Sequence, residues 1–157
     1  MSENQQSSTK NHQPKLKVCG LTQLTQIQEL IDLKIDYLGF IFYEKSPRNV
    51  LNHLSLEQIS EINHQGKFGV FVNEDLVKIV EISEQAKLNF IQLHGDENED
   101  FILNLKQKLN PEIKIIKVIR VGNQTNEELQ KTINQQPTTI NYLVFDTDSQ
   151  AFGGTGK

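Results

Sequence analysis

The chain has 157 residues, a formal net charge of -4 at pH 7 and one cysteine, and this length suits one domain with a core of its own. Because Lys and Arg form no basic stripe, the composition disfavours nucleic-acid binding. No apolar stretch approaches the roughly 20 residues of a membrane span, and a single cysteine cannot form an internal disulfide, so we expect a cytoplasmic protein with a reduced thiol.

The chain opens with a polar segment and continues as a regular alternation. Residues 1–14 contain no aliphatic side chain after Met1, which predicts a disordered N-terminal tail before a domain that covers residues 15–157. From Lys15 onward, short apolar runs alternate with longer segments whose apolar residues recur every three or four positions. The short runs predict six strands: Leu16–Cys19, Tyr37–Tyr43, Phe68–Val72, Phe90–Leu93, Lys114–Val121 and Tyr142–Phe145.

The longer segments predict helices between consecutive strands, each with one apolar stripe. Connections that contain a helix return the chain in the same direction, so the sheet is expected to be parallel. The residues predicted to start the five helices are Thr22, Ser55, Asn73, Asp96, and Thr125 or Asn126.

The chemically distinctive residues follow the predicted strands. Cys19, Arg48, His94 and Asp146 all lie at or just after a strand end. In a parallel βα sheet these loops share one edge, where α/β proteins place their chemistry. We therefore expect the four side chains to line one site at this edge of the sheet.

Cys19 and Asp146 make a plausible proton-transfer pair. A Cys19 thiolate would remove a proton, and a protonated Asp146, in an apolar setting beside Val144 and Phe145, would deliver one. The alternative is that Cys19 is a buried structural thiol and Asp146 a carboxylate that caps a helix.

Three more side chains are predicted to bind substrate. Arg48 follows a Ser-Pro turn, where its guanidinium could hold a carboxylate through two hydrogen bonds; the alternative is a surface arginine paired with Glu44 or Glu57. Gln92 and His94 alternate along one strand and should face the same side, toward the site. His94 has no partner at ligand spacing, so we expect no metal.

The last residues resemble a phosphate-binding loop only in part. The Walker pattern requires Gly at position 151 and Ser or Thr after the lysine, but Ala151 stands in the first place and Lys157 is the last residue. We interpret Gly153 and Gly154 instead as part of a mobile loop that binds substrate by closing over it.

Five motifs in order resemble phosphoribosylanthranilate isomerase: KVCGLT from Lys17, GFIFY with KSPR from Gly39, GVFVN from Gly69, QLHG from Gln92, and FDT with the final GGTGK from Phe145. The resemblance implies a (βα)8 TIM barrel and an intramolecular aldose–ketose isomerase of aromatic amino-acid biosynthesis. The reaction it implies, a step of L-tryptophan biosynthesis, is the Amadori rearrangement of N-(5-phosphoribosyl)anthranilate to 1-(2-carboxyphenylamino)-1-deoxyribulose 5-phosphate.

The resemblance also implies roles for single residues. Asp146 would be the general acid that protonates the ribose ring oxygen, Cys19 the general base that removes the C2 proton, and Arg48 the group that holds the anthranilate moiety. The small phosphorylated substrate would need no cofactor or metal.

Only about six βα units are recognisable, whereas the barrel has eight and usually at least about 200 residues. No segment matches the family's phosphate-binding motifs, so we expect poor substrate binding despite both proton-transfer residues. Open barrel edges would favour self-association. The alternatives are an inactive truncated fragment, a non-catalytic α/β binding module in which Cys19 is only core, and a different sugar-phosphate isomerase or phosphate-binding barrel.

Overall fold

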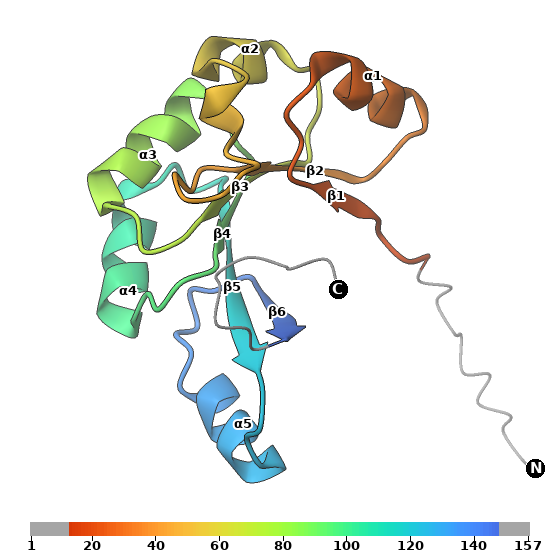
Figure 1. Cartoon of the computed structure of the whole chain (residues 1–157). Helices are drawn as coiled ribbons and strands as arrows, with labels where there is room; N and C mark the ends of the chain where they lie inside the picture. The colour runs from red at the N-terminus through yellow and green to blue at the C-terminus, as the bar shows by residue number, and fades with distance from the viewer. Residues whose placement is uncertain (1–12, 148–157) are drawn as a thin grey trace, which may run out of the picture.

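The computed structural model describes residues 13–147, so the predicted loop residues Gly153 and Gly154 lie outside the described part of the chain. Six parallel strands form one sheet in the order β1-β2-β3-β4-β5-β6 (Figure 1). The prediction of six parallel strands is confirmed, with boundaries that move by up to two residues. The strands are β1 Lys17–Cys19, β2 Tyr37–Ile41, β3 Lys67–Phe71, β4 Phe90–Leu93, β5 Lys114–Val121 and β6 Tyr142–Thr147.

A helix follows each of the first five strands. The α-helices are α1 Leu24–Asp32, α2 Leu56–Glu61, α3 Leu76–Gln85, α4 Glu99–Lys108 and α5 Asn126–Asn134, and a short 3-10 turn, η1 Val50–Asn52, precedes α2. Each strand after β1 pairs with the strand before it in the chain. This sequential order is that of a βα barrel, whereas a doubly wound sheet reverses its order at a switch point.

The main core lies between the sheet and its helices. Figure 1 shows α1 to α4 along one side of the curved sheet. Alternate strand residues on that side, including Leu38, Phe40, Phe71, Ile91 and Ile115, are fully buried in one hydrophobic cluster. Since strand side chains point alternately to the two faces, the intervening residues form the opposite, concave face.

Two helix starts were predicted correctly. Ser55 and Thr125 are the N-caps of α2 and α5, and each forms a capping box with the residue three positions later. The pattern of Ser or Thr followed by Gln or Glu is local, so the sequence alone identifies it.

Three helix starts were wrong: Thr22, Asn73 and Asp96 are replaced as N-caps by Gln23, Asp75 and Asn98. Asn73 has a φ of 49°, and its Oδ1 accepts a hydrogen bond of 2.7 Å from the backbone N–H of Asp96. These two residues join one loop to another, a tertiary contact that no local capping pattern reveals.

A buried lysine supports the helix side of the sheet. The side chain of Lys67, at the start of β3, donates hydrogen bonds to the carbonyls of Ile59 at 3.1 Å and Ala86 at 3.2 Å. These carbonyls belong to the ends of α2 and α3, where a cation is favourable. Burial lowers the pKa of Lys67, and the charge of nearby Lys87 lowers it further.

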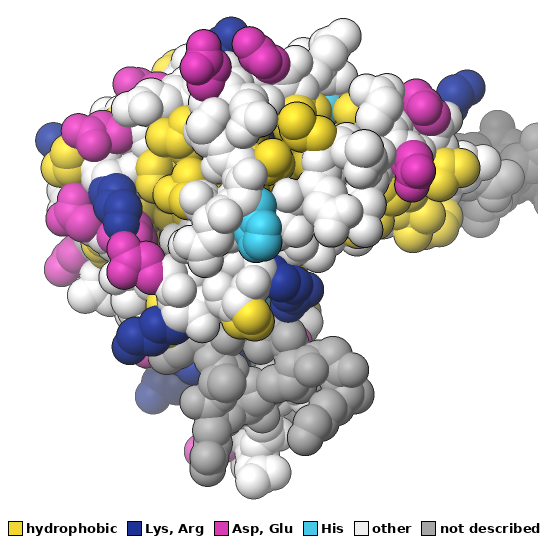
Figure 2. All heavy atoms as spheres, turned by 45° about the horizontal axis from the view of Figure 1, so that its top comes forward, with side chains coloured by type: hydrophobic (Ala, Val, Ile, Leu, Met, Phe, Trp, Pro, Cys, Tyr) yellow, Lys and Arg dark blue, Asp and Glu magenta, His cyan; other side chains and the backbone are white. Residues whose placement is uncertain are grey.

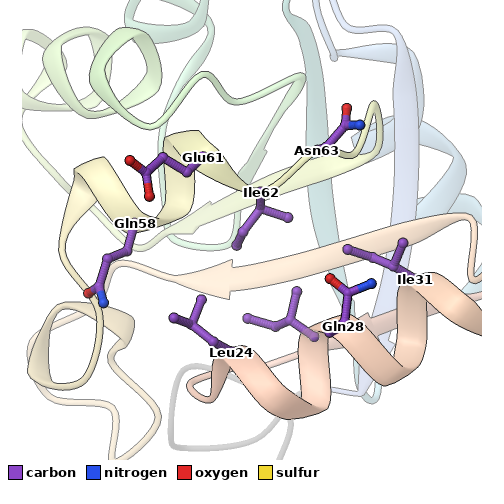
Figure 3. A pocket seen from close by; sticks show the side chains of 8 residues that line it. Leu24, Gln28, Ile31, Gln58, Glu61, Ile62 and Asn63 are labelled. Carbon is purple, nitrogen blue, oxygen red and sulfur yellow. The ribbon is translucent and has the colours of Figure 1, made fainter.

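The outer surface carries charges of both signs. In the view of Figure 2, acidic and basic side chains are interspersed and no basic stripe crosses the face. A groove between α1 and α2 is lined partly by Leu24, Ile31 and Ile62 (Figure 3). The groove contains none of the predicted site residues. Among the described residues, no helix has the length and apolar character that crossing a membrane requires.

Candidate active site on the concave face of the sheet

A chain of hydrogen bonds connects three strands on the concave face. Lys17 of β1 donates to Oε1 of Gln92 in β4. The Nε2 atom of Gln92 lies 3.4 Å from Nδ1 of His94, and Nε2 of His94 lies 3.1 Å from Oδ2 of Asp146 in β6. The structure therefore brings together His94 and Asp146, which are 52 positions apart in the sequence.

The contact between Lys17 and Gln92 requires a strongly curved sheet. Cys19 is in register with Gly39, Phe68 and Phe90 on the next three strands, so Lys17 lies two residues before that level and Gln92 two residues after it. In a flat sheet they would be separated by about 14 Å across the strands and about 13 Å along them. A direct hydrogen bond forms because the sheet curls as part of a barrel.

Lys17 was not predicted as a site residue. Its ammonium lies 4.4 Å from the centre of the Phe68 ring, a cation–π contact. Burial lowers the pKa of Lys17, and the neighbouring Cys19 raises it. A signal was present in the sequence, because Lys17 stands two positions before Cys19 in one strand and must share its face.

Cys19 ends β1 with its side chain exposed. The alternative of a buried structural thiol is therefore wrong. The sulfur lies directly over the next strand: a Cβ atom added to Gly39 would be 2.8 Å from Sγ of Cys19. The glycine at position 39 thus leaves room for the Cys19 thiol. A thiol that accepts a proton from a substrate must be accessible to that substrate.

Arg48 lies beside the loop that follows Cys19. A Cβ atom added to Gly20 would be 2.8 Å from a terminal guanidinium nitrogen of Arg48 and 2.9 Å from its Cδ. Gly20 also has a φ of 83°, so glycine is favoured there for backbone reasons as well. The structure therefore places Arg48 next to the end of β1, as the sequence predicted.

The His94 ring is mostly buried, with 10% of its side chain exposed. Burial lowers its pKa, since the imidazolium would lose hydration, and Asp146 opposes this shift only in part. Asp146 accepts hydrogen bonds at both oxygens, from His94 and, at 2.9 Å, from the backbone N–H of Thr147. The apolar setting expected for Asp146 from Val144 and Phe145 is not found, because both of those side chains are exposed.

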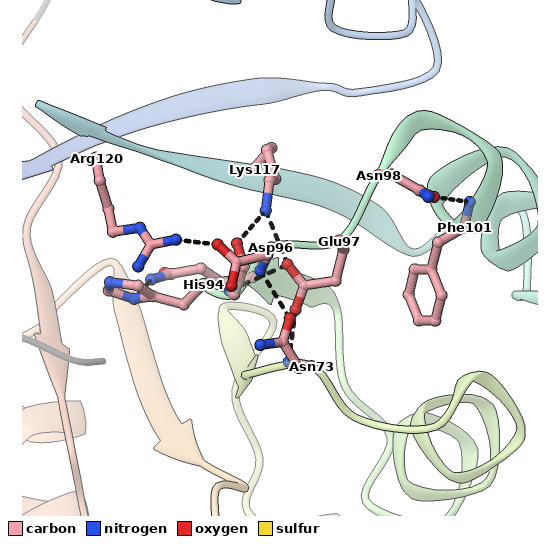
Figure 4. A network of polar contacts seen from close by, with 10 residues as sticks. Asn73, His94, Asp96, Glu97, Asn98, Phe101, Lys117 and Arg120 are labelled. Carbon is pink, nitrogen blue, oxygen red and sulfur yellow. Dashed lines mark hydrogen bonds and ion pairs between the residues drawn. The ribbon is translucent and has the colours of Figure 1, made fainter. Parts of the chain in front are cut away.

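A buried ion pair that the sequence analysis missed fixes the loop after β4 (Figure 4). Lys117 donates to Glu97 at 2.8 Å and to the carbonyl of Gly95 at 2.7 Å. The two oxygens of Glu97 accept the backbone N–H groups of Gly95 at 3.0 Å and of Asn73 at 2.9 Å. This network anchors the residues directly after His94. The sequence does contain a sign of this ion pair, because Lys117 is a charged residue within the otherwise apolar middle of β5.

A second ion pair, between Arg120 of β5 and Asp96, lies at the same loop (Figure 4). Within residues 13–147, no group of three or more His, Cys, Asp or Glu side chains is arranged to hold a metal ion. The candidate site therefore consists of Cys19, Arg48, His94 and Asp146, with Lys17 and Gln92 beneath them.

Comparison with known proteins agrees with this arrangement. The family model described as N-(5'-phosphoribosyl)anthranilate (PRA) isomerase matches residues 16–157. The chain belongs to the PRA isomerase family. A PRA isomerase of Staphylococcus aureus is 37% identical over 148 residues, which cover 91% of this chain and 66% of the relative. The chain thus spans slightly less than two thirds of that relative's length.

Solved structures of the PRA isomerase family share the fold. The enzyme of Thermotoga maritima matches with a TM-score of 0.69 and 30% identity, over 92% of this chain and 66% of that one. Another isomerase structure, in complex with reduced 1-(o-carboxyphenylamino)-1-deoxyribulose 5-phosphate, matches with a TM-score of 0.65 and 28% identity, over 87% of this chain and 66% of that one. The six strands and five helices therefore correspond to part of a TIM-barrel-type fold, as predicted.

Proposed function

We propose that this chain carries the proton-transfer residues of a phosphoribosylanthranilate isomerase, which acts on N-(5-phosphoribosyl)anthranilate in tryptophan biosynthesis. The observation that supports this most directly is that Cys19 and Asp146 lie on the same concave face, at the carboxyl ends of β1 and β6. Two groups that exchange protons with one small substrate need this placement.

The proposed reaction begins at Asp146, which protonates the ribose ring oxygen so that the ring opens to a Schiff base. The Cys19 thiolate then removes the proton from C2, and the resulting enolamine tautomerises to the ketone. Both oxygens of Asp146 accept hydrogen bonds in the described structure, from His94 and from the backbone N–H of Thr147.

Arg48 is proposed to bind the anthranilate carboxylate. Its guanidinium lies against Gly20, one residue after the Cys19 thiol, so a carboxylate held there would bring the substrate to the proposed base. A lysine would keep the charge but lose the forked geometry. We expect Arg48→Lys to raise KM for phosphoribosylanthranilate more than it changes kcat.

The substrate itself can distinguish this proposal from another sugar-phosphate isomerase. An analogue that lacks the carboxylate, N-(5-phosphoribosyl)aniline, should be turned over much less well by the wild-type chain, and Arg48→Lys should not weaken it further. Equal turnover of both compounds would favour a different sugar-phosphate substrate.

The main test is the loss of fluorescence of freshly generated phosphoribosylanthranilate in the presence of the purified chain. Cys19→Ser and Asp146→Asn should each reduce turnover by at least about 10²-fold, the usual contribution of a general acid or base. Val77→Ala, on the exposed side of α3, is the matched control and should not change it. Turnover that survives both site variants would overturn the proposal.

Absence of turnover by a folded wild-type chain would instead favour the alternative of an inactive fragment or a non-catalytic binding module. We further propose a cytoplasmic location, which is consistent with a general base that must remain a reduced thiol.

A further inference from the structure

The hydrogen-bond chain on the concave face has only one consistent direction. A charged Lys17 ammonium can only donate, so the atom of Gln92 that faces it must be the carbonyl oxygen. The other end of the amide, its NH2 group, can only donate as well. The Nδ1 atom of His94, which faces this group at 3.4 Å, must therefore be an unprotonated acceptor.

The same reasoning determines where the proton of His94 lies. A neutral imidazole carries one proton, and with Nδ1 unprotonated that proton is on Nε2. This atom faces Oδ2 of Asp146 at 3.1 Å, so the ring donates to the carboxylate. The direction of all three hydrogen bonds thus runs from the cation on β1 to the anion on β6.

We propose that Lys17 and Gln92 are positioning residues that hold His94 as the Nε2–H tautomer and so orient the Asp146 carboxyl group. Gln92 is almost fully buried, and both ends of its amide are engaged within the chain. We therefore assign Gln92 to positioning rather than to the direct substrate contact expected from the sequence.

The consequence for the reaction rests on the proposed function. Oδ2 of Asp146 accepts from His94 and Oδ1 accepts from the backbone N–H of Thr147, so the two contacts together fix the plane of the carboxyl group that would deliver the proton to the ring oxygen. His94 would keep its own proton throughout. His94 then orients the Asp146 carboxyl group, while Lys17 and Gln92 orient the His94 ring.

Three charged groups act electrostatically on the His94 ring. They are Asp146 on β6, Glu97 in the loop after β4, and Lys117 on β5. Of these, only Asp146 has a hydrogen bond to the ring, so the ring's proton position depends on Gln92 at one nitrogen and Asp146 at the other.

The test is nitrogen-15 NMR of the histidine rings in the full chain near neutral pH, with the His94 signals assigned through His94→Asn. We expect Nδ1 of His94 to be unprotonated and Nε2 to be protonated. His64 is an internal reference, because its Nδ1 accepts from the N–H of Gly66 at 2.9 Å and its Nε2 lies 2.9 Å from the carbonyl of Ile35.

Gln92→Glu is the most informative variant, since it keeps the shape but replaces the donor that faces His94 with an acceptor. We expect Nδ1 of His94 to become protonated while the His64 signals stay unchanged. Lys17→Met removes the group that fixes the amide and should give a mixture of tautomers. Lys114→Met is the control, because Lys114 lies over another ring of the sheet, Phe90, and outside the hydrogen-bond chain.

A wild-type His94 with its proton on Nδ1 would overturn the proposal, even if neither variant folds. An unchanged His94 tautomer in folded Gln92→Glu would also overturn it. Where turnover is measurable, Lys17→Met should lower kcat by about 10²-fold, the cost of misplacing a catalytic group by about 1 Å, with little change in KM. A wild-type chain without turnover would remove the proposed function but leave the tautomer result intact.

Discussion

Glu97 and Lys117 form an ion pair of 2.8 Å whose side chains are 1% and 9% exposed. Removing one partner of such a pair leaves an uncompensated buried charge. We expect Lys117→Met to lower the free energy of unfolding by about 3–5 kcal/mol, as measured by urea denaturation.

The more exposed pair between Lys78 and Glu74 provides the comparison, and Lys78→Met should cost at most about 1 kcal/mol. Replacing both buried partners, Glu97→Leu with Lys117→Met, should not restore stability fully. The double variant would still leave the N–H groups of Gly95 and Asn73 without the acceptor that Glu97 provides. Equal costs for Lys117→Met and Lys78→Met would contradict this account.

Gly39→Ala should displace the thiol of Cys19. The added Cβ would lie 2.8 Å from Sγ and 3.0 Å from Cα of Cys19, so rotation of the side chain cannot relieve the whole contact. We expect a loss of about 1–3 kcal/mol in stability and an altered rate of thiol labelling by an aromatic disulfide reagent. Val77→Ala should leave both unchanged. A wild-type labelling rate in folded Gly39→Ala would show that the reactivity of the Cys19 thiol does not depend on the space over Gly39.

Stability should fall in acid because of His94. Its pKa in the folded chain is lowered from 6.5 by burial, so between the two pKa values the unfolded chain binds more protons. The free energy of unfolding therefore rises with pH through this window, and the full penalty applies below the folded pKa. Urea denaturation at several pH values should show a smaller dependence for His94→Asn than for wild type. Substitution of the exposed His53 by Asn is the control, and an identical effect of both substitutions would refute the assignment to His94.

The edge strand β6 should promote self-association of the 157-residue chain. Phe145 is 52% exposed and Val144 39% exposed on its two faces, beside a strand edge whose backbone can pair with another chain. Sedimentation velocity should show assembly that increases with concentration and is reduced by Phe145→Asp. Leu33→Asp, a change at a 73% exposed leucine outside the sheet, should have no effect. A monomer at all concentrations would contradict the prediction.

The sequence predicted most of the fold because its signals are local. Alternation of apolar runs and helical periodicity identified the six strands and five α-helices that the structure describes between residues 13 and 147, and the capping boxes at Ser55 and Thr125 marked two helix starts. The helix starts near Asn73 and Asp96 were missed, since these residues bond to each other across two loops rather than to their own helices.

The sequence by itself also determined which chemical groups stand at the strand ends, because parallel βα order brings Cys19, Arg48, His94 and Asp146 to one edge. Only the tertiary structure decided how these groups are connected. The hydrogen bond between Lys17 and Gln92 depends on the curl of the sheet, and the buried pair of Glu97 and Lys117 depends on the packing of one loop against β5. Curvature and burial arise from contacts between distant segments, and no local pattern encodes them.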